Sequence, residues 1–352
     1  MKILKNRNLF AVMLSLLALL VMPGCGYSSG VKFDPAKQHH GDGRFISKKQ
    51  GSFFGHMFMR MREDAPPEQD PEAVKAIVAI ADQELINSPA EVPRATWIGH
   101  ATTLIQYKGI NFLTDPHLTQ YPFYFESFVE PRYTQPALSF EQMPEIDFIV
   151  ISHNHYDHLD HRTVELFGDS VLWYVPLGLK VWFIDRGISA DRVIELDWWQ
   201  SDQFNDDVEV TFTPAEHWSK RTPWDQNQSL WGGWAVDIAG FKSWFAGDTA
   251  YHPRYFRDIG RRLGPFRLAM IPIGAYAPRY FMADSHVDPE EAVDIHLDVG
   301  AQQSLPVHWG TFQLTIEPAL QPPQLLRAVL KERGIPLTQF EPVRIGDTLI
   351  LD

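Results

Sequence analysis

The chain has 352 residues, enough for a large hydrophobic core, and one α/β sandwich can use most of that length as a single domain. Its formal net charge of −13 argues against nucleic acid as a partner and against electrostatic attachment to anionic lipid. The single cysteine, Cys25, excludes an internal disulfide and a thiolate metal site. Any metal chemistry must therefore rest on histidine and carboxylate side chains.

Residues 1–25 have the pattern of a signal peptide, with basic residues before an apolar stretch from Phe10 to Met22 that is short for a membrane span. Cys25 follows a small residue, which resembles a bacterial lipoprotein signal, so we expect lipidation of Cys25. Ordinary signal cleavage and an uncleaved anchor are the alternatives. By this resemblance we expect a membrane-anchored lipoprotein of the bacterial cell envelope, with the outer membrane favoured because Gly26, and not aspartate, follows the cysteine.

Residues 26–91 are expected to form a tether and an N-terminal arm with a helix. The stretch 26–50 is polar and is interpreted as the tether, in which His39 and His40 are solvated. Residues 52–62 mix Phe and Met with Arg. This mixture fits either a surface that contacts lipid acyl chains or an arm that packs on the following domain.

Residues 92–352 are expected to form one catalytic domain. Just before it, a helix is predicted over 71–86, with Asp70 as N-cap and proline at the first helical position. The domain then begins with a β-hairpin, in which strands at 103–107 and 110–114 flank a lysine-glycine turn.

The segment 117–136 is predicted to be a loop, and it contains six tyrosine and phenylalanine residues among prolines. A loop this aromatic should not lie in water without a reason. A lid or wall for fatty acyl chains and simple packing under the sheet fit this composition equally well.

A polar cluster, His-Asn-His-Tyr-Asp-His, follows a strand-like, mostly apolar run at 146–152. His153 and His155 are two residues apart, so on an extended chain they point the same way and can reach one metal ion. Asp157 and His158 follow closely and can face a second position. Imidazole nitrogen suits Zn, Fe, Ni or Cu, and a carboxylate widens the choice. The alternative interpretation is a polar loop that happens to contain histidines.

After this cluster the predicted elements alternate, with a helix at 161–166, a strand at 172–175 and a helix at 179–186. Another helix is predicted from Pro289 to Asp298, because Asp288 is a good N-cap and an acidic residue stands where a capping box needs it. The alternation is typical of an α/β domain.

Two metal sites need further ligands, because zinc takes about four ligands per ion. Three later strand-like runs each end at or shortly before a candidate ligand. These candidates are His217, Asp248 and His308.

The order HxHxDH, then His, Asp and His, resembles the signature of the metallo-β-lactamase superfamily. Further strings resemble the N-acylphosphatidylethanolamine-hydrolysing phospholipase D family, and they lie at residues 195–199, 217–221, 245–249, 271–276, 286–292 and 308–312. The resemblance covers residues 92–350. It implies an α/β fold of the metallo-β-lactamase αββα sandwich type.

The resemblance also implies two metal ions per chain, zinc by default, with iron or manganese left open. It assigns one ion to three histidines, the second ion to two histidines and an aspartate, and a bridging position to one more aspartate. These residues are, in that order, His153, His155 and His217; His158, His308 and Asp157; and Asp248.

Asp157 and His286 are the predicted catalytic residues. By resemblance, His286 lies beside the substrate phosphate, where an imidazolium stabilises the phosphorane or protonates the leaving alkoxide. The alternative is a histidine at a helix entry that bonds its own backbone. Asp115 is expected to orient the metal ligands by hydrogen bonds, the alternative being a plain turn aspartate. His100 is interpreted as a structural turn residue.

Lys220 and Arg221 are predicted to bind substrate and to offset charge on the phosphate oxygens. Tyr156 is also predicted to contact substrate, with packing as its alternative. The predicted substrate-binding residues are therefore Tyr156, Lys220, Arg221 and His286.

The implied activity is that of a metal-dependent phosphodiesterase of the phospholipase D type. It hydrolyses N-acylphosphatidylethanolamine to N-acylethanolamine and phosphatidic acid by attack of a hydroxide bound to two metal ions. One alternative is a hydrolase of the same fold that acts on a lactone or another phosphoester. Another is a non-catalytic envelope lipoprotein that keeps the metal for folding. The expected partners are a phospholipid substrate and a membrane, contacted through a lipid anchor and apolar surface. The sequence leaves the oligomeric state open, with a homodimer as one option.

Overall fold

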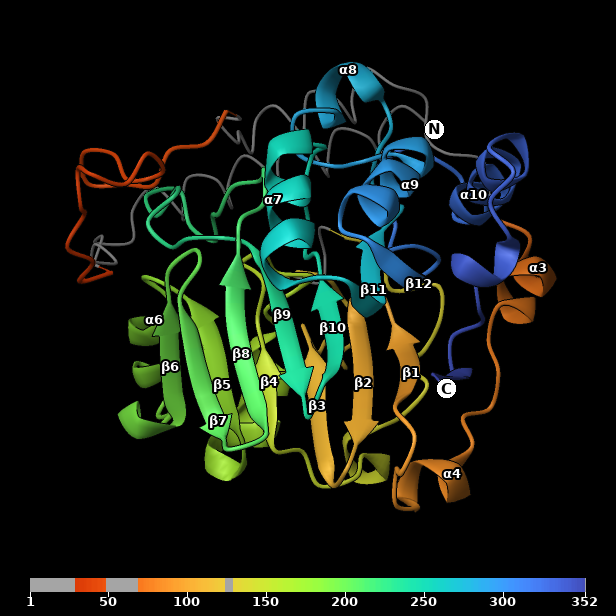
Figure 1. Cartoon of the computed structure of the whole chain (residues 1–352), viewed down its shortest axis with the longest axis horizontal. Helices are drawn as coiled ribbons and strands as arrows, with labels where there is room; N and C mark the ends of the chain where they lie inside the picture. The colour runs from red at the N-terminus through yellow and green to blue at the C-terminus, as the bar shows by residue number, and fades with distance from the viewer. Residues whose placement is uncertain (1–28, 49–68, 124–128, 352) are drawn as a thin grey trace, which may run out of the picture.

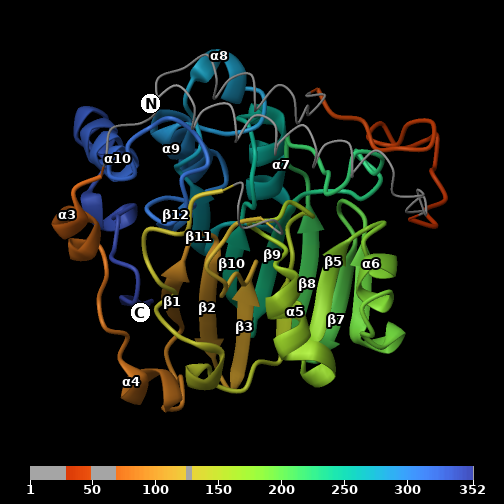
Figure 2. The same ribbon diagram turned by 180° about the vertical axis from the view of Figure 1, so that it is seen from behind.

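The computed structural model describes residues 29–48, 69–123 and 129–351, and it consists of two facing β-sheets flanked by helices (Figures 1 and 2). The first sheet has seven strands in the order β13-β1-β2-β3-β4-β5-β6. In chain order these are Arg94–Gly99 (β1), Thr102–Tyr107 (β2), Ile110–Thr114 (β3), Phe148–Val150 (β4), Leu172–Pro176 (β5), Val193–Leu196 (β6) and Thr348–Ile350 (β13).

The second sheet has six strands in the order β12-β11-β10-β9-β8-β7. In chain order these are Ser201–Asn205 (β7), Val208–Thr213 (β8), Gly233–Ile238 (β9), Phe241–Phe245 (β10), Phe266–Pro272 (β11) and Ala301–Val307 (β12).

The α-helices of the described chain are Pro71–Ala76 (α3), Gln83–Asn87 (α4), His161–Phe167 (α5), Lys180–Ile184 (α6), Pro253–Leu263 (α7), Arg279–Met282 (α8), Pro289–Asp298 (α9) and Gln321–Glu332 (α10). Short 3-10 turns lie at Phe140–Gln142, Gly168–Ser170, Ala190–Arg192 and Leu337–Gln339. Helix α6 packs on β6, while α9 packs on β11 and β12 and also contacts α7 and α10. Within the described ranges, the structure contains no helix with the length and apolar character that crossing a bilayer requires.

Two apolar layers hold the sandwich together. Side chains from both sheets, including Trp97, Phe212 and Trp234, fill the space between the sheets and are fully buried. A second cluster joins the outer face of the first sheet to the helices, and it includes Trp173 of β5 and Phe183 of α6. Strands covered on both faces become apolar at nearly every position. The predicted αββα arrangement is therefore present in the structure.

Strand direction places the functional loops. Strands β3, β4, β5 and β6 run parallel, and so do β10, β11 and β12. Strand β8 is antiparallel to β9, which is antiparallel to β10, so β8 and β10 share a direction. Since parallel strands end at the same edge of a sheet, the loops that follow β8, β10 and β12 leave the second sheet together, and those after β3 and β4 leave the first sheet together.

The predicted helix over 71–86 is wrong in extent, because it forms the two short helices α3 and α4. Between them Val78 pairs with Ile345 in a parallel bridge, and the backbone N–H of Ala79 donates to Ile345 O at 2.7 Å. This pairing with the distant C-terminal segment draws the chain into an extended conformation. The N-cap prediction holds, since the Asp70 side chain accepts a hydrogen bond from the backbone N–H of Glu72.

Residues 29–48, expected to be part of a solvated tether, instead pack on the catalytic domain. Phe45 is 1% exposed and belongs to the large core cluster of the domain. His40 is also buried, so the expectation of two solvated histidines is wrong for this residue. The stretch 52–62, expected to contact lipid or to pack as an arm, lies outside the described residues.

Trp234 on β9 joins the two sheets beside the polar cluster, because its indole Nε1–H donates to Ile151 O at 2.8 Å. In Trp234→Phe this buried carbonyl loses its partner, which costs about 1–3 kcal/mol of unfolding free energy. Urea unfolding at fixed metal content measures the change. Trp224→Phe is the matched control, since Trp224 is 52% exposed and its substitution should change stability by less than about 0.5 kcal/mol. Equal losses in the two variants would contradict the proposed link between the sheets.

Candidate metal centre

Three histidine nitrogens converge at one end of the cluster. His153 Nε2 lies 2.8 Å from His155 Nδ1, and His217 Nε2 lies 3.2 Å from the same atom. Tetrahedral zinc with Zn–N bonds of about 2.0–2.1 Å separates neighbouring nitrogens by about 3.3 Å. The spacing therefore fits three imidazoles around one cation.

A second group lies beside the first. Asp157 Oδ2 is 3.4 Å from His158 Nε2 and 3.4 Å from His308 Nε2, and these two nitrogens are 3.1 Å apart. Their ligand atoms, with that of His100, all lie within 4.8 Å of one another. The structure thus places a second group of possible metal ligands directly beside the first.

Asp248 lies between the two groups. Its Oδ2 is 3.1 Å from His158 Nε2, and its Oδ1 is 3.3 Å from His308 Nε2. The same Oδ2 is 3.8 Å from His153 Nε2 and 3.9 Å from His217 Nε2. One carboxylate therefore faces both donor sets, as a bridging ligand must.

Asp115 hydrogen-bonds the predicted ligand His158 and the backbone just before His153. It is fully buried, and its Oδ1 accepts a hydrogen bond from the backbone N–H of Ser152 at 2.7 Å. Its Oδ2 lies 2.7 Å from His158 Nδ1 and accepts from the Ser152 hydroxyl. Donation from Nδ1–H leaves His158 Nε2 directed at Asp248, which fixes the orientation of this imidazole. Burial raises the pKa of Asp115, although hydrogen bonds from His158 and Ser152 oppose that rise.

The electrostatics of the cluster call for a cation. Burial lowers the pKa of His153 and His155 well below its usual value, so both imidazoles are in the neutral form that binds metal. Burial also opposes charge on His158, yet Asp248 and Asp157 raise its pKa well above normal. The carboxylates of Asp157 and Asp248 thus favour a positive charge at the position where a divalent ion would be held. Neutral imidazoles with carboxylates suit zinc, iron or manganese.

His100 belongs to this centre, and the sequence interpretation missed its contact. Its Nε2 lies 3.0 Å from Asp157 Oδ2, and its ring centroid is 4.1 Å from that of His308. Its backbone has a φ of 53°, so it is also the turn residue that was expected. A lone histidine between two strands carries no sequence signal for a contact with a residue 57 positions away.

His286 lies at the edge of the cluster and is 9% exposed. Its Nδ1 is 3.9 Å from Asp248 Oδ2, and its ring centroid is 5.1 Å from that of His217. The neighbouring Ser285 contributes its carbonyl oxygen to His217 Nδ1 at 2.8 Å. The loop before α9 therefore places one imidazole beside the centre and orients another.

Arg221 and Lys220 contact the loop of residues 153–159, which carries four of the predicted ligands and is called the metal-binding loop. The Arg221 guanidinium Nη1 donates to the carbonyl oxygens of Asn154 at 2.9 Å and Leu159 at 2.7 Å, and its Cζ lies 4.1 Å from the Tyr156 ring centroid. These bonds hold the guanidinium against the backbone of the metal-binding loop, and the substrate role of Arg221 stays a prediction. The backbone N–H of Lys220 likewise donates to Asn154 Oδ1 at 2.8 Å.

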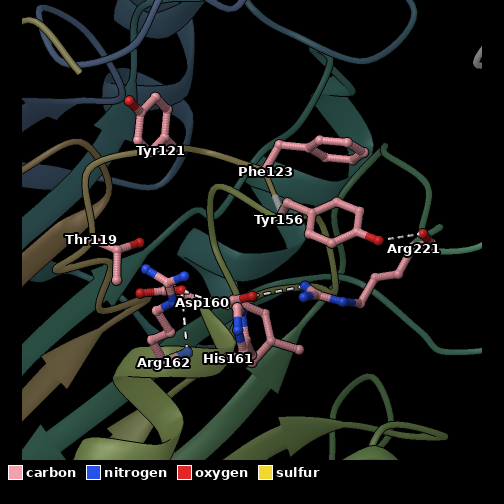
Figure 3. Close-up of a pocket in the computed structure, with 9 residues that line it drawn as sticks. Thr119, Tyr121, Phe123, Tyr156, Asp160, His161, Arg162 and Arg221 are labelled. Atoms are coloured by element: carbon pink, nitrogen blue, oxygen red, sulfur yellow. Dashed lines mark hydrogen bonds and ion pairs between the residues drawn. The ribbon is translucent and has the colours of Figure 1, made fainter. Parts of the chain in front are cut away.

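A cleft of about 330 Å³ opens beside the metal-binding loop (Figure 3). Aromatic rings form one part of its wall, where Phe123 and Tyr156 meet at 4.6 Å in an edge-to-face contact, and the Tyr156 hydroxyl donates to Arg221 O. Its lining residues are Thr119, Tyr121, Phe123, Tyr156, Leu159, Asp160, His161, Arg162 and Arg221. A second cleft of about 310 Å³ is lined in part by His308, Trp309 and Phe312. Tyr124, Phe125 and Phe128 of the aromatic loop lie outside the described residues.

The fold and the paired donor sets define a class of protein. Residues 110–309, more than half of the chain, match the family model described as β-lactamase superfamily domain. Among solved structures, an isothiocyanate hydrolase from Delia radicum gut bacteria superimposes with a TM-score of 0.59 at 18% identity, covering 73% of this chain and 98% of that one. The chain is therefore a metal-dependent hydrolase of the metallo-β-lactamase superfamily, and the predicted αββα fold is confirmed.

Two curated relatives narrow the class. The chain is 42% identical over 265 residues to N-acyl-phosphatidylethanolamine-hydrolyzing phospholipase D 1 of Caenorhabditis elegans, covering 72% of this chain and 74% of the relative. It is 36% identical over 246 residues to the mitochondrial enzyme of that name from Saccharomyces cerevisiae, covering 68% and 52%. The chain belongs to the N-acylphosphatidylethanolamine-hydrolysing phospholipase D family, as its motifs indicated.

The predicted location is wrong by the same comparison. The relatives that carry the family name come from eukaryotes, and the name of the yeast protein places it in mitochondria, so membership of the family does not support a bacterial outer-membrane lipoprotein. Cys25, the predicted lipidation site, and the rest of residues 1–25 lie outside the described part of the chain.

Asp115→Asn should weaken metal binding about 10- to 100-fold, because one amide cannot accept from both Ser152 and His158 as the carboxylate does. Metal per chain after dialysis against graded chelator measures this loss. Asp147→Asn is the control, since Asp147 also accepts a backbone N–H, from Asn111, away from the ligands. Equal metal retention in the Asp115 and Asp147 variants would show that Asp115 does not orient the ligands.

Proposed function

We propose that this chain hydrolyses N-acylphosphatidylethanolamine to N-acylethanolamine and phosphatidic acid. Its relatives carry that activity in their names, and its site gathers histidine and aspartate side chains that could bind metal beside a partly aromatic cleft. The observation that carries the proposal is the position of Asp248 between two groups of imidazole nitrogens. Neither the site nor the comparisons favour a lactone as substrate.

Two divalent ions, with zinc as the first choice, would be held by the seven predicted ligands. One donor set is His153, His155 and His217, the other is Asp157, His158 and His308, and Asp248 would contact both. When bound, such ions acidify water and neutralise charge on phosphate oxygens. The remaining steps fall to the side chains of the chain itself.

His286 is placed to serve the leaving group. Its imidazole lies beside Asp248, with Nδ1 3.9 Å from Oδ2, at the edge of the two proposed donor sets. From that position it would give a proton to the alkoxide oxygen of the departing N-acylethanolamine. Arg279 holds this residue by donating from Nη1 to His286 O at 2.8 Å, and a salt bridge at 2.8 Å ties the same guanidinium to Glu291 of α9. These two bonds fix the loop before α9, which carries the imidazole of His286.

The cleft beside the metal-binding loop suits an amphipathic substrate. Tyr121, Phe123 and Tyr156 offer apolar ring faces to acyl chains, while Arg162 offers positive charge to a phosphate. We propose that the phospholipid approaches from a lipid surface through apolar contacts. The described part of the aromatic loop then forms a wall of the substrate site.

Asp248→Asn should abolish turnover of N-acylphosphatidylethanolamine, because both donor sets lose their shared carboxylate. The loss of activity should exceed about 100-fold, the upper effect of removing a residue that only hydrogen-bonds a metal ligand. Products are identified and counted by mass spectrometry of the lipid extract. Asp207→Asn, at an exposed aspartate of a β-turn, should keep full activity. A wild-type chain that binds two metal ions but releases neither product would reject the proposed substrate.

His286→Ala should lower kcat about 10²- to 10⁴-fold while both metal ions stay bound, since the substitution removes a proton donor and not a proposed ligand. Steady-state kinetics and metal analysis of the same preparation provide the two readings. His252→Ala, at a histidine that stacks on Tyr255 outside the cluster, is the control. An unchanged kcat in the His286 variant removes this residue from the chemistry.

A further inference from the structure

The N-terminal segment 29–48 lies against the β6 end of the sandwich, where it is drawn in red (Figures 1 and 2). Hydrogen bonds tie it to the domain at two places. One is Asp197, directly after β6, and the other is the loop 217–228, which begins with the proposed metal ligand His217. The segment therefore connects a buried carboxylate outside the metal centre to a loop that forms part of it.

Asp197 anchors the segment. The carboxylate is 1% exposed, and its Oδ2 accepts from Lys37 Nζ. The Nε2 atoms of His39 and His40 lie 2.7 Å from Oδ1 and 3.1 Å from Oδ2. Burial alone raises the pKa of Asp197, but hydrogen bonds from His39 and Lys37 hold it well below the usual range. A charged, multiply bonded carboxylate of this kind strongly favours the docked segment.

The three residues His39, His40 and Asp197 also have the composition of a metal site, with ligand atoms within 4.8 Å of one another. The hydrogen bonds argue against that interpretation. His40 Nδ1 accepts from the backbone N–H of Asp34 at 2.9 Å, so the proton of the neutral ring is on Nε2, the atom that faces Asp197. A metal ligand needs a lone pair at that atom, and the ammonium of Lys37 already occupies the carboxylate.

The far end of the segment holds the loop 217–228 at both of its ends. The Ser47 hydroxyl donates to His217 O at 2.6 Å, and the backbone N–H of Phe45 donates to Asn227 O at 2.8 Å. Asn227 in turn closes the loop on Ser219, by N–H donation to Ser219 O at 2.8 Å and by acceptance at Oδ1 from Ser219 N–H at 3.2 Å. The carbonyl of His217 thus has its position set from outside the metal centre.

A second contact at the same point strengthens the link. Lys48 Nζ lies 3.5 Å from the carboxylate of Glu216, the residue before His217. Phe45 is buried against Trp231, and His39 stacks on Trp198 with ring centroids 4.2 Å apart. Ring packing at His39 and Phe45 therefore holds the segment between the anchor at Asp197 and the contact at His217.

We infer that residues 29–48 form a latch that positions His217 for metal binding, with Asp197 as the anchor and Ser47 as the positioning residue. This inference rests on the metal ligation proposed above. Because His217 Nδ1 already bonds Ser285 O, a fixed backbone leaves one ring orientation in which Nε2 meets His153 and His155. Loss of the latch should loosen one donor set and spare the other.

The test measures metal release from the full chain loaded with two zinc ions, followed by a colorimetric chelator. Ser47→Ala should release one of the two ions about tenfold faster than wild type. This is the low end of the loss of metal affinity seen when a residue that hydrogen-bonds a metal ligand is removed. Ser47→Thr keeps the hydroxyl and should restore slow release. The matched control is Ser170→Ala, because the Ser170 hydroxyl also donates to a carbonyl, that of Phe167 at 2.5 Å, at the opposite end of the parallel strands.

The anchor is tested with Lys37→Ala/His39→Ala, which alters the latch side and leaves the buried carboxylate in place. This pair should speed release of the same ion, and adding Ser47→Ala should speed it no further, because both changes act through one segment. If Ser47→Ala or the Lys37→Ala/His39→Ala variant releases zinc at the wild-type rate, the latch is contradicted while the proposed metal centre stands. A third zinc ion in wild type, absent from the anchor variant, overturns it in favour of a metal site at Asp197. A wild-type chain that never loads two ions overturns the proposed centre and the latch together.

Discussion

The buried carboxylate of Asp115 fixes the centre on which the rest of the structure depends. It accepts from Ser152 at the end of the apolar run before the polar cluster and from His158 within the cluster, so the backbone and one ligand are set by a single group. Above it, Asp157 and Asp248 concentrate negative charge among buried imidazoles. Charge buried in this way is costly unless it is paired, and a bound cation is the pairing that the donor atoms offer.

The sandwich makes this concentration of polar groups compatible with a stable core. Two apolar layers carry the fold, and the polar groups gather at one edge, in loops that follow β3, β4, β8, β10 and β12. Contacts from outside the centre then fix these loops. Arg221 holds the metal-binding loop through backbone carbonyls, Ser285 orients His217, and Ser47 reaches the same residue from the N-terminal segment. Function therefore depends on residues well beyond the donor sets.

Patterns local in sequence predicted much of this structure. The capping pattern at Asp288 predicted helix α9, which runs from Pro289 to Asp298, and the ends of apolar runs predicted which residues would gather at the centre. Contacts between distant positions carry no such signal. The pairing of Val78 with Ile345 divided a predicted helix, and the bond from His39 to Asp197, 158 residues away, turned an expected tether into a packed segment. The bonds of Arg221 to the carbonyls of Asn154 and Leu159 were likewise not predicted, because sequence shows a charge but not the carbonyls that surround it.

The central claim is that this centre attacks the phosphorus atom of a phosphodiester. The most direct test is hydrolysis of N-acylphosphatidylethanolamine by the zinc-loaded chain in water enriched in oxygen-18, with both products weighed by mass spectrometry. We predict one labelled oxygen in the phosphate of phosphatidic acid and none in N-acylethanolamine, because attack at phosphorus leaves the old oxygen with the alcohol. Label in N-acylethanolamine, or products cut elsewhere in the lipid, would contradict the claim.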